Sequence, residues 1–120
     1  MKSLGIPHYG TIVMCPPVTT LVAGAACTCC AAVARAMDEW QGDIVVDLTN
    51  IIEADARGLA LLALAAQRGR GRVRFAGATC PTVRTLVEVT RLDEKLVFHA
   101  DVESALVAIR DRPASERAAA

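Results

Sequence analysis

Aromatic residues are scarce in this 120-residue sequence, which contains one Trp, one Tyr and two Phe. Proteins that bind single-stranded nucleic acid stack bases on aromatic side chains, so this chain lacks such a platform. A charge of one sign is also lacking, because thirteen Lys and Arg residues balance thirteen Asp and Glu residues. A balanced chain has no overall electrostatic attraction for nucleic acid or for an anionic membrane. We therefore predict no nucleic-acid partner.

A hydrophobic run long enough to cross a membrane is missing too. A spanning helix needs about 20 apolar residues, whereas the run over residues 18–33 is shorter and contains three threonines. Residues 21–27 are similar to a lipoprotein cleavage site, so a membrane-tethered lipoprotein is an alternative. Against it, Pro16 and Pro17 break the apolar segment of a signal peptide, and Gly24 stands where that site favours Leu. We predict no membrane insertion and a cytoplasmic location.

The sequence contains five cysteines, an odd number that argues against a disulfide framework. Cys27, Cys29 and Cys30 fall within a predicted helix. At 100° per residue Cys27 and Cys30 share a face, whereas Cys29 points about 160° away from Cys27, so the three thiolates cannot converge on one tetrahedral metal. We predict that they pack like alanine, with a metal site or a redox site as the alternatives. Cys15 and Cys80 fall near the ends of predicted elements, and a reducing compartment is the expected setting.

Signatures of catalysis and of nucleotide binding are absent as well. The chain has no Gly-x-x-x-x-Gly-Lys loop and no Gly-x-Gly-x-x-Gly fingerprint. Neither His8, in a predicted turn, nor His99, at a predicted strand end, has a nucleophilic Ser or Cys in a catalytic context. An acidic Mg²⁺ site at Asp43, Asp47 and Asp55 is an alternative, but Asp47 ends a predicted core strand and Asp55 has a capping role. We predict no enzyme activity, no metal and no cofactor.

What the sequence does contain is a strand followed by a helix over residues 43–64. β-Branched residues over 44–48 give way, after a short loop, to leucines at helical spacing over 59–64. Asp55 stands where an N-cap belongs, and its carboxylate can accept hydrogen bonds from N–H groups of the first helical turn. Gly58 leaves that turn without a side chain. The segment predicts an approachable helix start after a strand, where open α/β sheets place their functional residues.

The rest of the chain alternates between strands and helices. Strands are expected over residues 4–6, 11–15, 73–75 and 96–98, a turn over 7–10, and helices over 20–40, from Pro81 onward and after Asp101. Thr19 or Thr20 is the expected cap of the first helix, and Gly69 the left-handed residue that ends the central helix. The buried stripes of the last two helices are predicted to be Val83, Leu86, Val87 and Thr90, and Val102, Ala105, Leu106 and Ile109.

This order predicts an α/β fold. We expect a mixed, mostly parallel sheet of four to five strands with about four helices, and one antiparallel edge near the amino end. A single domain is expected over residues 1–112, followed by a disordered tail over residues 113–120. The arginine-rich turn over residues 68–72 is predicted to be a solvated turn, with an acidic partner or a phosphate as the alternative.

Several of these segments also resemble a known family. They are the strand over 44–48, the sequence Asp55-Ala56-Arg57-Gly58-Leu59, the segments over 70–75 and 83–86, and Thr90-Arg91-Leu92-Asp93. In order and spacing, over roughly residues 40 to 110, they resemble the STAS domain, which is shared by anti-sigma factor antagonists and the cytoplasmic tails of sulfate transporters. The resemblance implies a STAS fold and a non-catalytic bacterial protein that regulates transcription by binding another protein.

The resemblance also implies where a partner binds. In the switching members of the family the helix start reads Asp-Ser-Ser-Gly, and the first Ser is phosphorylated by a partner kinase that is also the anti-sigma factor. Here that position is Ala56, which has no hydroxyl group, and the second Ser is Arg57. We therefore expect binding of a serine-kinase-type anti-sigma factor through Asp55, Ala56, Arg57, Gly58 and Leu59, without serine phosphorylation control.

A second departure from the family lies at residues 16–20. The family usually carries Gly-Glu-Leu-Asp at this corner, whereas this chain reads Pro-Pro-Val-Thr-Thr. The alternative function is therefore a diverged STAS scaffold, or a subunit of another assembly such as a lipid-transport, transporter or stress complex. Phosphorylation of another hydroxyl group, such as that of Thr49 or Thr79, and the oligomeric state are left open by the sequence.

Overall fold

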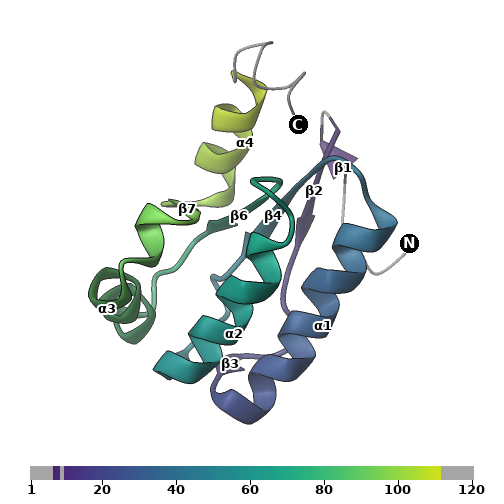
Figure 1. Ribbon diagram of the computed structural model, residues 1–120. Coiled ribbons are helices and arrows are strands. Elements are labelled where there is room, and N and C mark those ends of the chain that lie inside the picture. The colour runs from purple at the N-terminus through teal and green to yellow at the C-terminus, as the bar shows by residue number, and fades with distance from the viewer. Residues whose placement is uncertain (1–6, 9, 112–120) are drawn as a thin grey trace.

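A computed structural model describes residues 7–8 and 10–111 of the chain (Figure 1). Strands and helices alternate from β5 onward, in agreement with the alternation that the sequence predicts for the second half of the chain. In chain order the elements are β1 (Pro7–His8), β2 (Thr11–Met14), β3 (Thr20–Leu21), α1 (Ala23–Glu39), β4 (Asp43–Asp47), β5 (Glu53–Ala54), α2 (Ala56–Gln67), β6 (Val73–Ala76), α3 (Pro81–Thr90), the 3-10 turn η2 (Leu92–Glu94), β7 (Val97–His99) and α4 (Val102–Arg110).

The main sheet has the strand order β1-β2-β4-β6-β7. Strands β2, β4, β6 and β7 run parallel, and β1 pairs with β2 in the antiparallel sense. The mostly parallel sheet with an antiparallel edge at the amino end is thus confirmed. Because the parallel strands share one direction, their carboxyl ends, including Asp47 of β4, meet at one edge of the sheet.

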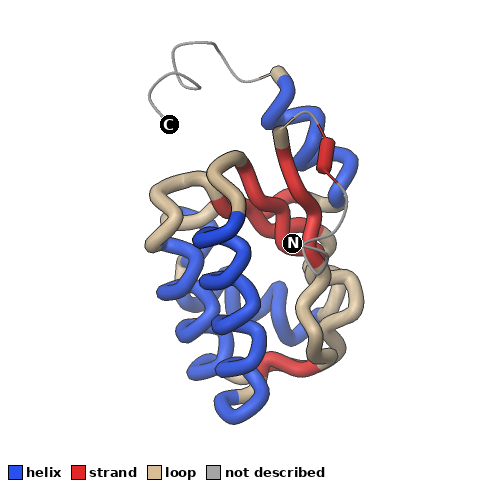
Figure 2. The backbone as a smooth tube through the Cα atoms, turned by 90° about the vertical axis from the view of Figure 1, so that its right-hand side faces the viewer, coloured by secondary structure: helices blue, strands red, loops and turns tan. Residues whose placement is uncertain are grey.

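Helices cover both faces of this sheet (Figure 2). Ile44 and Val46 of β4 belong to the large core under α1 and α2, whereas Val45 packs with Ala105 and Ile109 of α4 on the other face. Successive side chains of a strand point to opposite faces, so both faces of β4 are buried and its three central residues are all apolar. Figure 1 shows α1 and α2 lying side by side over the larger core.

Two short strands that the sequence did not indicate form a second sheet. β3 pairs in parallel with β5, Thr20 opposite Glu53 and Leu21 opposite Ala54. The prediction of a Thr19 or Thr20 cap is therefore wrong, because Thr20 lies in a strand and α1 begins at Ala23. Each strand of this small sheet leads directly into a helix, β3 into α1 and β5 into α2, so it fixes the two helix starts next to each other.

Three smaller expectations at element ends need correction. Pro7 and His8 belong to β1 instead of a turn. Thr90 is exposed instead of buried, and its hydroxyl group donates to Leu86 O. Gly69 does not end α2 in the left-handed conformation; Arg70 (φ 51°) and Gly71 (φ 88°) adopt it instead. The expected strand over residues 4–6 and the tail over 113–120 lie outside the described residues.

One arginine of the predicted solvated turn has a structural role. Arg72 is half-buried, and its Nη1 atom donates to the carbonyl oxygens of Trp40 (2.7 Å) and Gly42 (3.1 Å). Its Nη2 atom donates to the carbonyl oxygen of Met37 (3.2 Å) in the last turn of α1. The guanidinium group thus satisfies carbonyl groups that the end of a helix leaves without intrahelical partners.

Two further features concern residues 7–8 and 10–111, namely membrane-spanning helices and clusters of metal ligands. In that part of the chain, no helix combines the length and the apolar character that crossing a bilayer requires. Within the same residues, no three or more His, Cys, Asp or Glu side chains are grouped so that they could hold a metal ion.

Candidate partner-binding site

The start of α2 is held by the carboxylate of Asp55. Its Oδ1 atom accepts a hydrogen bond from the backbone N–H of Gly58 at 2.7 Å, which confirms the predicted N-cap. Its Oδ2 atom accepts a second, longer bond from the N–H of Ala23 at 3.4 Å, at the start of α1. One side chain therefore meets the positive ends of two helix dipoles, and its negative charge is stabilised from both sides.

Gly58 allows α2 to approach β3 closely. A Cβ atom at this position would lie 1.7 Å from the carbonyl oxygen of Leu21 and 3.1 Å from Asp55 Oδ1. The first turn of α2 has no side chain at Gly58, as predicted, but Gly58 itself is not approachable from outside, because the backbone of β3 lies against it. The hydrogen bond from Asp55 N to Leu21 O (3.3 Å) belongs to the same contact.

The structure divides the five residues that were predicted to bind a partner. Asp55, Ala56 and Arg57 are exposed, whereas Gly58 is buried and Leu59 is only 2% exposed. Leu59 belongs to the large core. Only the first three residues can touch another protein without rearrangement of the fold. The other two are buried beneath them and hold the helix start against the core.

Ile52 is a candidate contact residue that the sequence did not reveal. Its side chain is 71% exposed, whereas that of the preceding residue, Ile51, is only 2% exposed. The backbone of Ile52 is held on both sides, since its N–H donates to Thr19 O (2.8 Å) and its carbonyl oxygen accepts from the Cys80 thiol (3.2 Å). An apolar side chain on a fixed backbone, three residues before Asp55, is a natural anchor for a protein partner. The only sequence signal was the Ile-Ile pair itself, which cannot tell which Ile faces inward.

The two threonines considered for modification are both exposed. The hydroxyl and N–H groups of Thr49 donate to Asp47 Oδ1. Asp47 therefore ends β4 as predicted and holds the following loop. A phosphate on Thr49 would be placed against this carboxylate and would be repelled by it.

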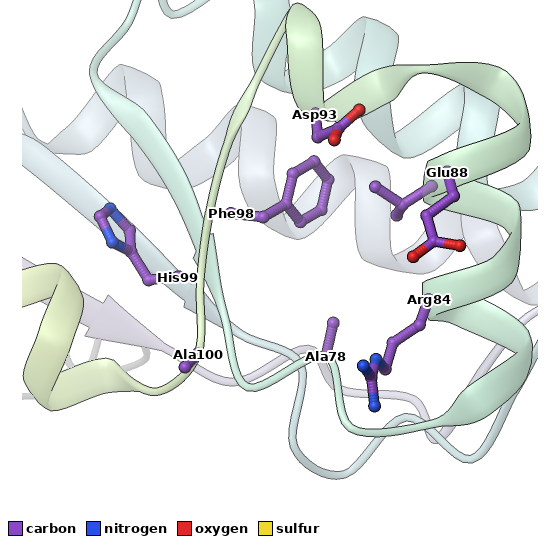
Figure 3. A pocket seen from close by; sticks show the side chains of 8 residues that line it. Ala78, Arg84, Glu88, Asp93, Phe98, His99 and Ala100 are labelled. Atoms are coloured by element: carbon purple, nitrogen blue, oxygen red, sulfur yellow. The ribbon is translucent and has the colours of Figure 1, made fainter.

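A hollow of about 300 Å³ lies between α3 and β7 (Figure 3). It is separate from the predicted residues and carries charges of both signs, from Arg84, Glu88 and Asp93. Its lining consists of Ala78, Arg84, Val87, Glu88, Asp93, Phe98, His99 and Ala100. The charges of Arg84 and Glu88, one turn apart on α3, oppose each other, and Asp93 adds a second carboxylate.

His99, which lines this hollow, is held by a neighbouring arginine. Arg74 Nη1 donates to His99 Nε2 at 3.1 Å, and since a guanidinium group has donors only, Nε2 acts as the acceptor. Burial lowers the pKa of His99, and the charge of Arg74 lowers it further. The imidazole ring is therefore neutral at pH 7.

Comparison with known proteins identifies the fold. No family model matches the sequence, and no curated protein matches it. Among solved structures, an anti-sigma factor antagonist (STAS) domain protein from Planctomyces limnophilus aligns with a TM-score of 0.71 and 19% identity, over 90% of this chain and 98% of that chain. The anti-sigma factor antagonist SpoIIAA, in its unphosphorylated form, aligns with a TM-score of 0.59 and 19% identity, over 91% of this chain and 97% of that chain.

The chain has the STAS-domain fold. A Thermotoga maritima protein gives a similar result, with a TM-score of 0.69 and 13% identity over 89% of this chain and 87% of that chain. The alignments cover nearly the whole length of both aligned chains, so the resemblance seen over residues 40–110 extends to the amino-terminal strands and α1. At these identities the likeness establishes the fold alone, and the function has to be argued from the surface at the start of α2.

Proposed function

We propose that this STAS protein is a non-catalytic interaction module that acts as an anti-sigma factor antagonist and binds a serine-kinase-type anti-sigma factor. The contact surface consists of Ile52, Asp55, Ala56 and Arg57, which we call the α2-start surface. The observation that carries the proposal is the 71% exposed side chain of Ile52 next to this helix start in a STAS fold. The buried Gly58 and Leu59 keep the surface in place.

Ala56 removes the usual control of binding. A phosphate on a serine at this position adds about two negative charges, next to a carboxylate that already uses the first N–H groups of both helices. Such a group has to be desolvated when a partner docks, which weakens the complex. Alanine cannot carry it, so the proposed complex forms without serine phosphorylation control.

Arg57 indicates the chemistry of the partner. Its side chain is exposed, and no ion pair joins it to a carboxylate among the described residues. A cation at a helix start opposes the dipole, at a cost of about 0.3–1 kcal/mol. An acidic group on the partner, close to a pocket that receives Ile52, offsets this cost in the complex.

The proposed function also implies a cellular location and a process. We place it in the bacterial cytoplasm, in transcription regulation, with no cofactor, no nucleic-acid partner and no membrane insertion. An interface of standard size buries about 1,600 Å² in total, which the α2-start surface and its surroundings can supply. The second candidate function is a diverged STAS scaffold or subunit of a lipid-transport, transporter or stress assembly, favoured by the Pro16-Pro17 corner and by Ala56.

The proposal is tested by co-purification from native cells with an Ile52→Asp variant. The matched control is Leu64→Asp, because Leu64 is also strongly exposed (61%) and lies more than two turns further along α2. We expect a serine-kinase-type anti-sigma factor with the wild type and with Leu64→Asp, and its loss with Ile52→Asp. Replacing Asp55 would be a poorer probe, because it also releases both helix starts.

Two outcomes would contradict the proposal. Equal recovery of the anti-sigma factor with Ile52→Asp and Leu64→Asp would place the contact elsewhere on the molecule. Recovery of scaffold or transporter subunits, with no anti-sigma factor, would leave the STAS fold intact and favour the second candidate function.

A further inference from the structure

Helix α1 carries three free cysteines that differ in accessibility. Cys27 is exposed, Cys30 is half-buried and Cys29 is fully buried. The side chain of Cys29 is 0% exposed and belongs to the large core, so it is out of reach of solvent. Any chemistry of this helix with solutes therefore belongs to the other two cysteines.

Cys27 and Cys30 form a pair on one flank of α1. They are three residues apart in a regular helix, which places their Cβ atoms about 5–6 Å from each other on the same face. The neighbouring helical residues on this flank, Ala23, Ala31 and Ala34, are too small to cover the pair.

The spacing of the pair favours a bridging metal ion over a disulfide. A disulfide requires Cβ atoms about 3.5–4.5 Å apart, which a regular helical turn does not provide. Metal–thiolate bonds are about 2.3 Å long, so an ion between the two sulfur atoms lets them stay up to about 4.6 Å apart. A side chain that is exposed or half-buried can adjust to this distance by rotation without unwinding α1.

The number of ligands selects the ion. Structural zinc takes four protein ligands, and the described residues contain no group of three or more His, Cys, Asp or Glu side chains that could hold a metal. Soft thiolates with no further ligand suit monovalent copper, which accepts two of them. The third thiol of α1 cannot join, because Cys29 lies in the core.

We propose that Cys27 and Cys30 form a two-coordinate site for Cu(I). Each thiol releases its proton to solvent, two copper–sulfur bonds form, and the ion leaves its carrier ligand without a change of oxidation state. The weak hydrogen bond from Cys27 Sγ to Ala23 O (3.8 Å) is lost when the thiol is deprotonated. The site is independent of the α2-start surface, so failure of the partner assay would not affect it.

The site is tested by anaerobic titration of the full chain with Cu(I), supplied as its acetonitrile complex and followed by native mass spectrometry. We expect one copper ion per wild-type chain, and loss of this ion in Cys27→Ser and in Cys30→Ser. The control is the Cys15→Ser, Cys80→Ser double variant, which keeps both cysteines of the pair and should keep the copper. Copper bound equally by Cys27→Ser, or lost from the double variant, would overturn the proposal.

A second measurement does not depend on the folding of any variant. Wild-type protein is treated with iodoacetamide with and without Cu(I), and the labelled cysteines are located by peptide mass spectrometry. We expect copper to slow the labelling of Cys27 and Cys30 and to leave that of Cys15 and Cys80 unchanged. Equal labelling rates at Cys27 with and without copper would refute the site.

Discussion

Replacing Gly58 by alanine tests how closely the start of α2 is held against β3. The new Cβ atom would lie 1.7 Å from the carbonyl oxygen and 2.5 Å from the carbonyl carbon of Leu21. Both atoms belong to the backbone, so no side-chain rotation can relieve the contact. The helix and the strand must separate. This movement weakens the hydrogen bond from Gly58 N to Asp55 Oδ1 and the one from Asp55 N to Leu21 O.

The size of the effect follows from these contacts. Overpacking costs about 1–3 kcal/mol, and the Asp55 cap and the Asp55 N to Leu21 O bond contribute about 1 kcal/mol each. Alanine recovers about 1 kcal/mol because it favours the helix more than glycine does. We therefore expect Gly58→Ala to lower the free energy of unfolding by about 2–4 kcal/mol.

Urea unfolding followed by circular dichroism measures this change, with Gly24→Ala as the matched control. Gly24 also lies in the first turn of a helix, but a Cβ atom there would have no atom within 4 Å. Without a steric conflict, this substitution should raise the free energy of unfolding by about 0.4–1 kcal/mol. If Gly58→Ala stabilised the protein as Gly24→Ala does, the contact between α2 and β3 would not exist as described.

Two further predictions concern Ala56 and Asp101. Ala56→Ser should make the chain a substrate of a serine-kinase-type anti-sigma factor, whereas Arg57→Ser should not; phosphate incorporated into Arg57→Ser would disprove the assignment of position 56. The bond from Ser104 N to Asp101 Oδ1 (2.7 Å) holds the pKa of Asp101 below its ordinary value. This carboxylate therefore contributes stability above its unfolded pKa of about 3.9, and the contribution is lost as the pH falls through the lower folded value. Asp101→Asn, a cap that does not titrate, should lose less stability in urea unfolding between about pH 5 and pH 3; equal losses would contradict this assignment.

Local signals account for the parts of the fold that the sequence predicted. The run of β-branched residues in β4, the N-caps Asp55 and Asp101, and Pro81 at the first position of α3 each act within a few residues of the chain. The strands and helices that these signals produce depend on backbone preferences and on the periodicity of apolar residues, and both can be read directly from a sequence. The order of these segments then predicted the mostly parallel sheet.

The features that the sequence did not predict depend on residues far apart in the chain. β3 and β5 have two residues each, and they become strands only because the fold brings residues 20–21 next to 53–54. Arg72 looked like part of a solvated turn, but its donors reach carbonyl groups 30 to 35 residues earlier in the chain. The exposure of Ile52 and the burial of Gly58 likewise follow from tertiary contacts, which no local pattern encodes.

The double role of Asp55 explains how a STAS fold can dispense with the usual serine. Asp55 joins the starts of α1 and α2 through the N–H groups of Ala23 and Gly58, and neither bond involves the side chain at position 56. Ala56 is exposed, so its replacement leaves the core and the cap intact. Under the proposed function, phosphorylation control depends on position 56 alone, whereas a change at Asp55 or Gly58 alters the fold that presents the α2-start surface. For this reason Ala56→Ser is the substitution that separates control from binding.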